Sequence, residues 1–135
     1  MAELAARNKD QVLRELASLA KTRGLDEAMV YAVLLDREKL GSTAVGEGIA
    51  IPHGKMPGLD SMLLAFARSS AGVDFNAPDG KNCRLFFMVL APDGAAGQHL
   101  GMLGAIARLA KDPTFTSRLL QAQNAAELVD FLSAV

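Results

Sequence analysis

The chain has 135 residues, of which 50% are hydrophobic and 21% are charged, and its formal net charge is −1. This length and composition predict one domain over residues 1–135, and the lack of a basic block argues against nucleic acid as the main partner. No apolar run reaches the ~18 residues that span a membrane, the N-terminus lacks a signal-peptide pattern, and the single cysteine, Cys83, excludes an internal disulfide, so we expect a cytoplasmic protein without membrane insertion.

The N-terminal part of the chain predicts two amphipathic helices, over residues 9–23 and 27–40. Asn8 and Asp26 are their expected N-caps, and Gly24 and Gly41 are their expected ends. Apolar residues at helical spacing are expected to be buried. These residues are Val12, Leu13, Leu16, Leu19 and Ala20 in the first helix, and Met29, Val30, Val33, Leu34 and Leu40 in the second.

Apolar runs in the middle of the chain predict strands. Residues 49–51 form a short buried strand that Pro52 ends, and residues 61–69 alternate imperfectly as a second strand. Residues 73–75 are a short extended piece, and Pro-Asp-Gly at 78–80 is a turn. The run over 84–91 is apolar almost throughout, which predicts a strand buried on both faces.

The C-terminal part predicts three further helices, over residues 96–111, 113–122 and about 124–134. Pro113 suits a first helical position, and Asn124 with Glu127 resembles a capping box. The apolar positions of the first of these helices are expected to be core contacts rather than a cofactor box. Because strands and helices alternate along the chain, the predicted fold class is α/β.

His53 is the candidate functional residue. The chain has only two histidines, His53 and His99, and His53 follows a predicted strand and precedes Gly54, which has no side chain to shield the ring. Imidazole is the side chain most able to act as a nucleophile near neutral pH. A lone histidine in a turn is more often a polar turn residue, but here glycines lie on both sides, and Ser42 and Thr43 offer hydroxyl groups.

The run over residues 37–55, Arg-Glu-Lys-Leu-Gly-Ser-Thr-Ala-Val-Gly-Glu-Gly-Ile-Ala-Ile-Pro-His-Gly-Lys, resembles the active-site signature of the enzyme IIA domains of the bacterial phosphoenolpyruvate-dependent phosphotransferase system. The resemblance is to the fructose/mannitol type, which includes the nitrogen-regulatory enzyme IIA proteins. Residues 72–81 and 91–109 resemble further segments of the family, so nearly the whole chain is covered. The resemblance implies a mixed β-sheet flanked by helices on both sides. Family members usually carry a further stretch before the first helix, whereas this chain starts close to that helix.

The resemblance also implies the roles of three residues. His53 matches the phosphorylated histidine, His99 the second histidine, which bonds the phosphoryl oxygens, and Arg37 an arginine near the site. These roles are chemically reasonable, because a helix start favours an anion beside His99 and a guanidinium holds phosphoryl oxygens as a fork. The alternatives are a surface histidine and a solvated arginine at a helix C-terminus.

Glu47, Ser42 and Thr43 are weaker candidates for phosphoryl binding. Glu47 could orient the imidazole or lie in solvent, and Ser42 could donate to the site or cap a turn. A rival set of zinc ligands, His53 and His99 with Glu47, lacks the spacing typical of zinc motifs. We therefore expect no metal and no cofactor.

Two functions follow from the resemblance. In the first, the protein accepts a phosphoryl group on His53 from the histidine phosphocarrier protein (HPr-like) and passes it to the cysteine of an enzyme IIB partner. In the second, which is nitrogen-regulatory, the phosphorylation state of His53 controls binding to regulatory proteins and no sugar is transported. We expect a standalone chain without a fused IIB, IIC or carrier segment, and this expectation favours the regulatory kind modestly.

Overall fold

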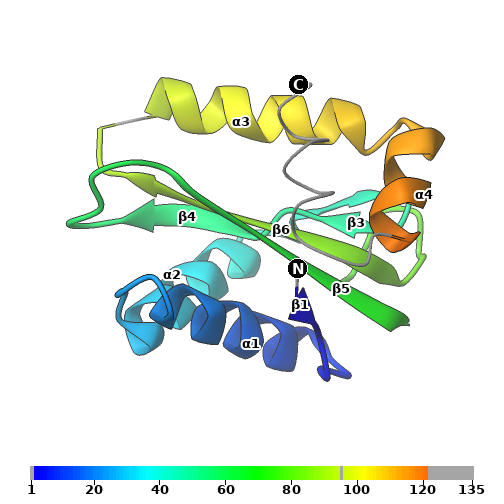
Figure 1. The fold of residues 1–135 in the computed structure, drawn as a ribbon, viewed down its shortest axis with the longest axis horizontal. Helices are drawn as coiled ribbons and strands as arrows, with labels where there is room; N and C mark the ends of the chain where they lie inside the picture. Colours follow the sequence, from blue (N-terminus) through cyan, green and yellow to red (C-terminus); the bar gives the residue numbers. More distant parts are fainter. Residues whose placement is uncertain (1, 95, 122–135) are drawn as a thin grey trace.

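The computed structural model describes residues 2–94 and 96–121, which form one mixed β-sheet with helices on both faces (Figure 1). The strands are β1 (Ala2–Glu3), β2 (Ala44–Gly46), β3 (Ile49–Ala50), β4 (His53–Met56), β5 (Leu63–Val73) and β6 (Cys83–Pro92). Their order is β1-β5-β6-β3-β2, and β4 also pairs with β6. β6 is antiparallel to β5 and parallel to β3 and β4, which confirms the predicted mixed sheet.

The helices cover the two faces of the sheet in pairs. α1 (Lys9–Lys21) and α2 (Glu27–Lys39) lie on one face, and α3 (Ala96–Leu109) and α4 (Pro113–Gln121) lie on the other (Figure 1). All four confirm predicted helices, with ends that agree to within two residues. The helix predicted after Asn124 lies outside the described residues. Within residues 2–94 and 96–121, no helix combines the length and the apolar character needed to cross a membrane.

Strand β6 is buried on both faces, as its apolar run predicts. Its residues alternate between two hydrophobic clusters, one under α1 and α2 and one under α3 and α4. The first cluster receives Phe86, Met88 and Leu90, and the second receives Leu85, Phe87 and Val89. Each of these side chains is at most 3% exposed, and full burial of such a side chain stabilises the fold by about 1.5–3 kcal/mol.

The predicted caps of the first two helices are confirmed. The side chain of Asn8 accepts a hydrogen bond of 2.9 Å from the Gln11 N–H, and that of Asp26 accepts one of 3.1 Å from the Met29 N–H. Gly24 follows α1 with φ +82°, a left-handed conformation that glycine adopts without strain.

The buried side of α2 differs from the prediction. Met29 and Leu40 were expected inside but are 46% and 84% exposed, whereas Val30, Leu34 and Glu38 are buried. These three residues are spaced four apart and form one side of the helix. Val30 and Leu34 are thus buried as predicted. The prediction was wrong for Met29 and Leu40, and it missed Glu38 because it considered apolar residues only.

The short strand before Pro52 stops as predicted, since β3 ends at Ala50 and neither Ile51 nor Pro52 belongs to a strand. The chain continues after Pro52 as β4, and both β3 and β4 run parallel to β6. Proline has no N–H to donate, but the Pro52 carbonyl accepts a hydrogen bond of 3.0 Å from the Val89 N–H. His53 therefore follows β3, as predicted, and also opens a further strand, β4, opposite Val89, which the sequence does not predict.

The far side of the sheet also differs in detail. β5 runs on to Val73, with an irregularity in its pairing after Arg68, and Phe75 lies outside it. The edge next to β5 is occupied by β1, which pairs in parallel with Ala67 and Arg68. The short stretch before α1 thus supplies an edge strand.

Gly54 brings α2 and β4 close together. A Cβ atom at this position would lie 2.2 Å from Cγ1 of Val33 in α2. The prediction that Gly54 leaves the His53 ring open therefore misses its main effect, which is to let a helix approach the strand that carries the histidine.

We expect Gly54→Ala to lower the free energy of unfolding by about 1–3 kcal/mol, the usual cost of overpacking, because Val33 is β-branched and has little rotamer freedom in a helix. The matched control is Gly101→Ala in α3, where a Cβ would meet no atom within 4 Å and where alanine is expected to stabilise by roughly 0.5–1 kcal/mol. Urea denaturation measures both. Equal stability of Gly54→Ala and wild type would show that the contact with Val33 is unimportant.

Candidate functional site

His53 is held in one tautomer by a backbone carbonyl two residues before it in the chain. Its Nδ1 lies 2.7 Å from the Ile51 carbonyl oxygen. A carbonyl only accepts hydrogen bonds, so we assign the proton to Nδ1. The lone pair of the neutral ring is then on Nε2, which points away from the strand backbone and is the atom able to attack an electrophile.

Arg37 reaches His53 from the last turn of α2. Its Nε donates to His53 Nε2 at 3.2 Å, and its Nη1 donates to the Gly41 carbonyl at 3.0 Å. The first contact agrees with a lone pair on Nε2, and the second anchors the guanidinium at the helix end. The structure thus brings Arg37 together with His53, as the sequence predicts.

His99 lies beside His53 from the opposite layer. It is near the start of α3, and the centroids of the two rings are 5.2 Å apart in an edge-to-face arrangement. His99 is only 7% exposed, and its Nε2 has no hydrogen-bond partner among the described residues. A buried polar atom without a partner is rare in native structures, so the Nε2 of His99 is free to bond a group that enters beside the two rings.

Both histidines are shifted toward the neutral state. Burial is the main cause that lowers the pKa of His53, and the positive charge of Arg37 lowers it further, against the opposing effects of the Ile51 hydrogen bond and the charge of Glu38. Burial also lowers the pKa of His99, followed by the effects of His53 and Lys55. Neutral rings keep the Nε2 lone pair of His53 available near pH 7.

The hydroxyl groups of Ser42 and Thr43 form hydrogen bonds within the protein. Ser42 Oγ donates to the Phe75 carbonyl and accepts from the Ala44 N–H, and Thr43 Oγ1 donates to Glu38. Both residues border the cleft beside His53, but their hydroxyl protons are already used. Their arrangement favours a structural role over direct binding of an anion.

Glu47 lies elsewhere. It is exposed in the turn between β2 and β3 with φ +56°, its N–H donates to Asp79 Oδ2 at 3.0 Å, and it lines a separate cleft with Lys81 and Arg84. Among the described residues no group of three or more His, Cys, Asp or Glu side chains is placed to hold a metal ion. The structure therefore does not assemble Glu47 with His53 and His99.

The cleft beside His53 has a volume of about 420 Å³ and mostly apolar walls. Arg37 and His53 lie in its lining, with the α3 residues Leu103 and Gly104 opposite. Two exposed apolar residues line this cleft: Val45 in β2 and Leu100 in α3, which are 41% and 73% exposed. We call these two residues the apolar rim.

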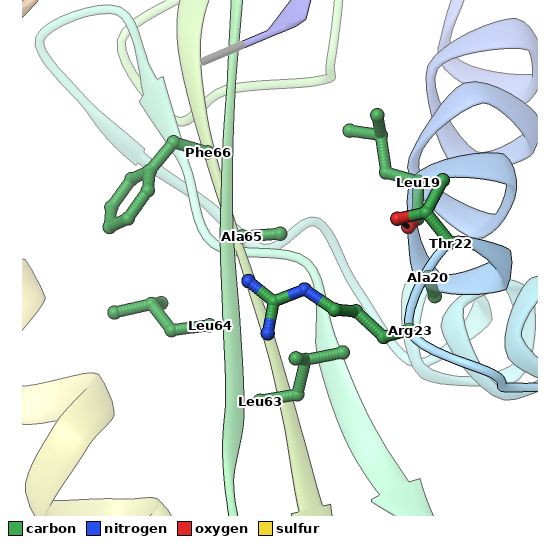
Figure 2. Close-up of a pocket in the computed structure, with 8 residues that line it drawn as sticks. All are labelled: Leu19, Ala20, Thr22, Arg23, Leu63, Leu64, Ala65 and Phe66. Atoms are coloured by element: carbon green, nitrogen blue, oxygen red, sulfur yellow. Dashed lines mark hydrogen bonds between the residues drawn. The ribbon is translucent and has the colours of Figure 1, made fainter. Parts of the chain in front are cut away.

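Other parts of the described chain offer no comparable chemistry. A hollow between the end of α1 and β5 is drawn in Figure 2, where the Arg23 guanidinium lies across the strand near Leu63 and Ala65. Arg23 is the only ionisable side chain of the eight drawn there. Cys83 is buried, and burial raises the pKa of its thiol to about 12, so it is not a nucleophile at neutral pH.

Comparison with known proteins finds relatives over nearly the whole chain. Residues 2–135 match the family described as phosphoenolpyruvate-dependent sugar phosphotransferase system, EIIA 2. The chain is 44% identical to a nitrogen regulatory protein of Bradyrhizobium diazoefficiens, over 96% of this chain and 86% of that protein. It is 36% identical to a PTS system fructose-specific EIIA component of Haloferax volcanii, over 94% and 84%. The crystal structure of nitrogen regulatory protein IIA-Ntr from Neisseria meningitidis has a TM-score of 0.88 at 35% identity, over 94% and 88%.

Both histidines are expected to titrate below the ordinary pKa of 6.5. The unfolded chain then binds more protons than the folded protein just below pH 6.5, so the free energy of unfolding should fall as the pH drops through this window. NMR titration of the ring C–H signals gives each pKa, and urea denaturation between about pH 5 and pH 7 gives the stability. A variant with both His53→Gln and His99→Gln should lose this part of the pH dependence. A ring pKa above 6.5 in the wild type would contradict the assignment.

Proposed function

This chain belongs to the EIIA 2 family of the phosphoenolpyruvate-dependent sugar phosphotransferase system, and we propose that it accepts a phosphoryl group on Nε2 of His53 and acts as a nitrogen-regulatory protein. The observation that carries the proposal is the pair of contacts on the His53 ring: Nδ1 bonds the Ile51 carbonyl, and Nε2 faces the Arg37 guanidinium. These contacts support a role of Nδ1 as a hydrogen-bond donor and of Nε2 as the nucleophile.

The transfer step needs no proton to leave His53. The lone pair on Nε2 forms the new N–P bond while the bond between phosphorus and the imidazole of a phosphocarrier protein breaks, and the electron pair returns to the carrier's ring. The phosphorylated ring keeps its Nδ1–H and carries positive charge, so the Ile51 carbonyl stabilises it. Such a charged ring is also a good leaving group for onward transfer.

Arg37 and the second histidine supply groups for the phosphoryl oxygens. Arg37 gives up its contact with Nε2 and turns its N–H groups to the oxygens, while Nη1 keeps its anchor on the Gly41 carbonyl. The unpartnered Nε2 of His99 lies within the same enclosure. Because the transition state of phosphoryl transfer is loose, such positioned donors contribute most of the catalysis.

A regulatory role fits a site of this kind. Phosphorylation places a group of about −2 charge on a ring that itself becomes positively charged, so the net change is about −1, in a cleft where neutral His53 meets Arg37. The apolar rim around it gives a partner protein a surface to dock on, with the changed charge at its centre. The relatives named for nitrogen regulation, at 44% and 35% identity, support this function over sugar transport.

A second candidate is the carrier function, in which the phosphoryl group passes from His53 to the cysteine of a IIB protein. The 36% identical relative named as a fructose-specific EIIA component supports it. Incubating the phosphorylated protein with a purified IIB domain and following loss of the label distinguishes the two. Rapid, complete transfer would favour the carrier function.

His53→Ala should abolish phosphorylation by phosphoenolpyruvate, enzyme I and the phosphocarrier protein, because the nucleophile is lost. Intact-protein mass spectrometry at mildly alkaline pH would show one added phosphoryl group in the wild type and none in the variant. In His99→Ala, labelling of His53 should persist, with onward transfer slowed about 10²–10³-fold by the loss of one donor. Labelling that survives in His53→Ala would refute the proposed function.

Arg37→Lys should slow transfer by about tenfold or more, although it keeps the positive charge, because lysine cannot reproduce the planar fork. Single-turnover rates of the two half-reactions measure the effect, and circular dichroism checks the fold. Lys39→Arg, which changes an exposed cation in the same helix turn, is the control and should be neutral. A wild-type rate in Arg37→Lys would remove Arg37 from the site.

A further inference from the structure

Glu38 is a buried carboxylate that no sequence pattern singles out, and it lies next to Arg37 in the last turn of α2. Building on the proposed function, we propose that Glu38 is a positioning residue, which keeps the Ile51 carbonyl in place and thereby holds His53 in the tautomer that can accept a phosphoryl group. It acts through Thr43 and Ile51 and does not touch the phosphoryl group itself.

The carboxylate of Glu38 is fully occupied by donors. Its side chain is 3% exposed and forms a salt bridge of 2.7 Å with Lys9 Nζ. The Thr43 N–H lies 3.2 Å from each of its oxygens, and the Thr43 hydroxyl also donates to it. A buried charge is costly unless it is paired and hydrogen-bonded, so this set of partners fixes the position of Glu38 closely.

From Glu38 a continuous series of hydrogen bonds leads to the ring of His53. Thr43, held by Glu38, accepts a bond of 3.0 Å from the Ile51 N–H through its carbonyl. The Ile51 carbonyl in turn accepts from His53 Nδ1 at 2.7 Å. Ile51 is thus tied to the segment after α2 on its N–H side and to the catalytic ring on its carbonyl side.

The same carboxylate acts on the ring through its charge. Glu38 opposes the effects of burial and of Arg37 on the His53 pKa, and it therefore favours the positively charged ring that forms when Nε2 is phosphorylated. Position and charge act together, since a phosphorylated ring needs both the Ile51 carbonyl and a nearby anion. A buried ion pair that served stability alone would leave the tautomer of His53 unchanged.

The test is Glu38→Gln, which keeps the shape of the side chain but removes the charge and weakens its hold on Thr43. Asp36→Asn is the matched control, since Asp36 lies in the same helix with a side chain that is 77% exposed. We measure the tautomer of His53 by ¹⁵N NMR of its ring and the rate of phosphoryl acceptance. In Glu38→Gln we expect a mixture of the two neutral tautomers and a rate about 10–100-fold lower, as is typical when an outer-shell orienting contact is lost. Asp36→Asn should match the wild type in both.

A double variant, Lys9→Met with Glu38→Gln, removes both charges and guards against a folding defect from an unpaired lysine. It should fold and show the same tautomer mixture. An unchanged tautomer in either folded variant would overturn the role of Glu38. The NMR measurement of the tautomer needs no phosphoryl donor, so it tests the positioning role separately from the proposed function. If the wild-type protein is never phosphorylated but the tautomer still changes in Glu38→Gln, the proposed function is refuted and the positioning role stands.

Discussion

Strand β6 constrains the whole described structure, because it has neighbours on both edges and packed side chains on both faces. β5 occupies one edge, and β3 and β4 share the other as two parallel pieces on either side of Pro52. Helices from opposite layers contact alternate residues of the same strand, so a shift of one layer disturbs the other. His53 is set opposite Val89 within this arrangement. The His53 ring therefore stands on a strand held from both sides, and helices α2 and α3 bring Arg37 and His99 to it.

The last turn of α2 carries two residues of opposite charge, one facing the cleft and one facing the core. Arg37 reaches the cleft and the His53 lone pair, while the next residue, Glu38, turns into the core, where Lys9 and Thr43 satisfy it. Consecutive residues of a helix point in different directions, so adjacent residues in one turn of α2 can contact both the cleft and the core. Arg37 lowers the pKa of His53 and Glu38 raises it, so the cation favours the neutral ring and the anion favours the charged ring. Under the proposed function, the neutral ring accepts the phosphoryl group and the charged ring carries it.

The parts of this fold that could be predicted are those with local causes. Helix caps and the doubly buried strand are visible in the spacing of residues, and the stretch ending at His53 pointed to the site through its resemblance to a family. The short strands β2 and β4 could not be foreseen, because pairing with neighbours, and not local preference, makes them extended. The burial of Glu38 could not be predicted from the sequence. Its partners, Lys9 and Thr43, do not lie three or four residues away, which is the spacing that predicts a side-chain pair on a helix. The displacement of Glu47 from the site depends on the tight turn between β2 and β3, whose direction no pattern revealed.

The unpartnered Nε2 of His99 has a consequence for how mutation can change the stability of this protein. A buried polar atom left without a hydrogen bond costs about 1–3 kcal/mol, so the fold carries a locally frustrated position next to the His53 ring. An apolar ring there, as in His99→Phe, would relieve that cost and, under the proposed function, would remove one of the groups offered to the phosphoryl oxygens. Selection for thermostability alone would thus favour a sturdier chain with slower phosphoryl transfer. Conversely, any oxyanion that satisfies the atom binds only the folded form and raises the stability of the entire domain.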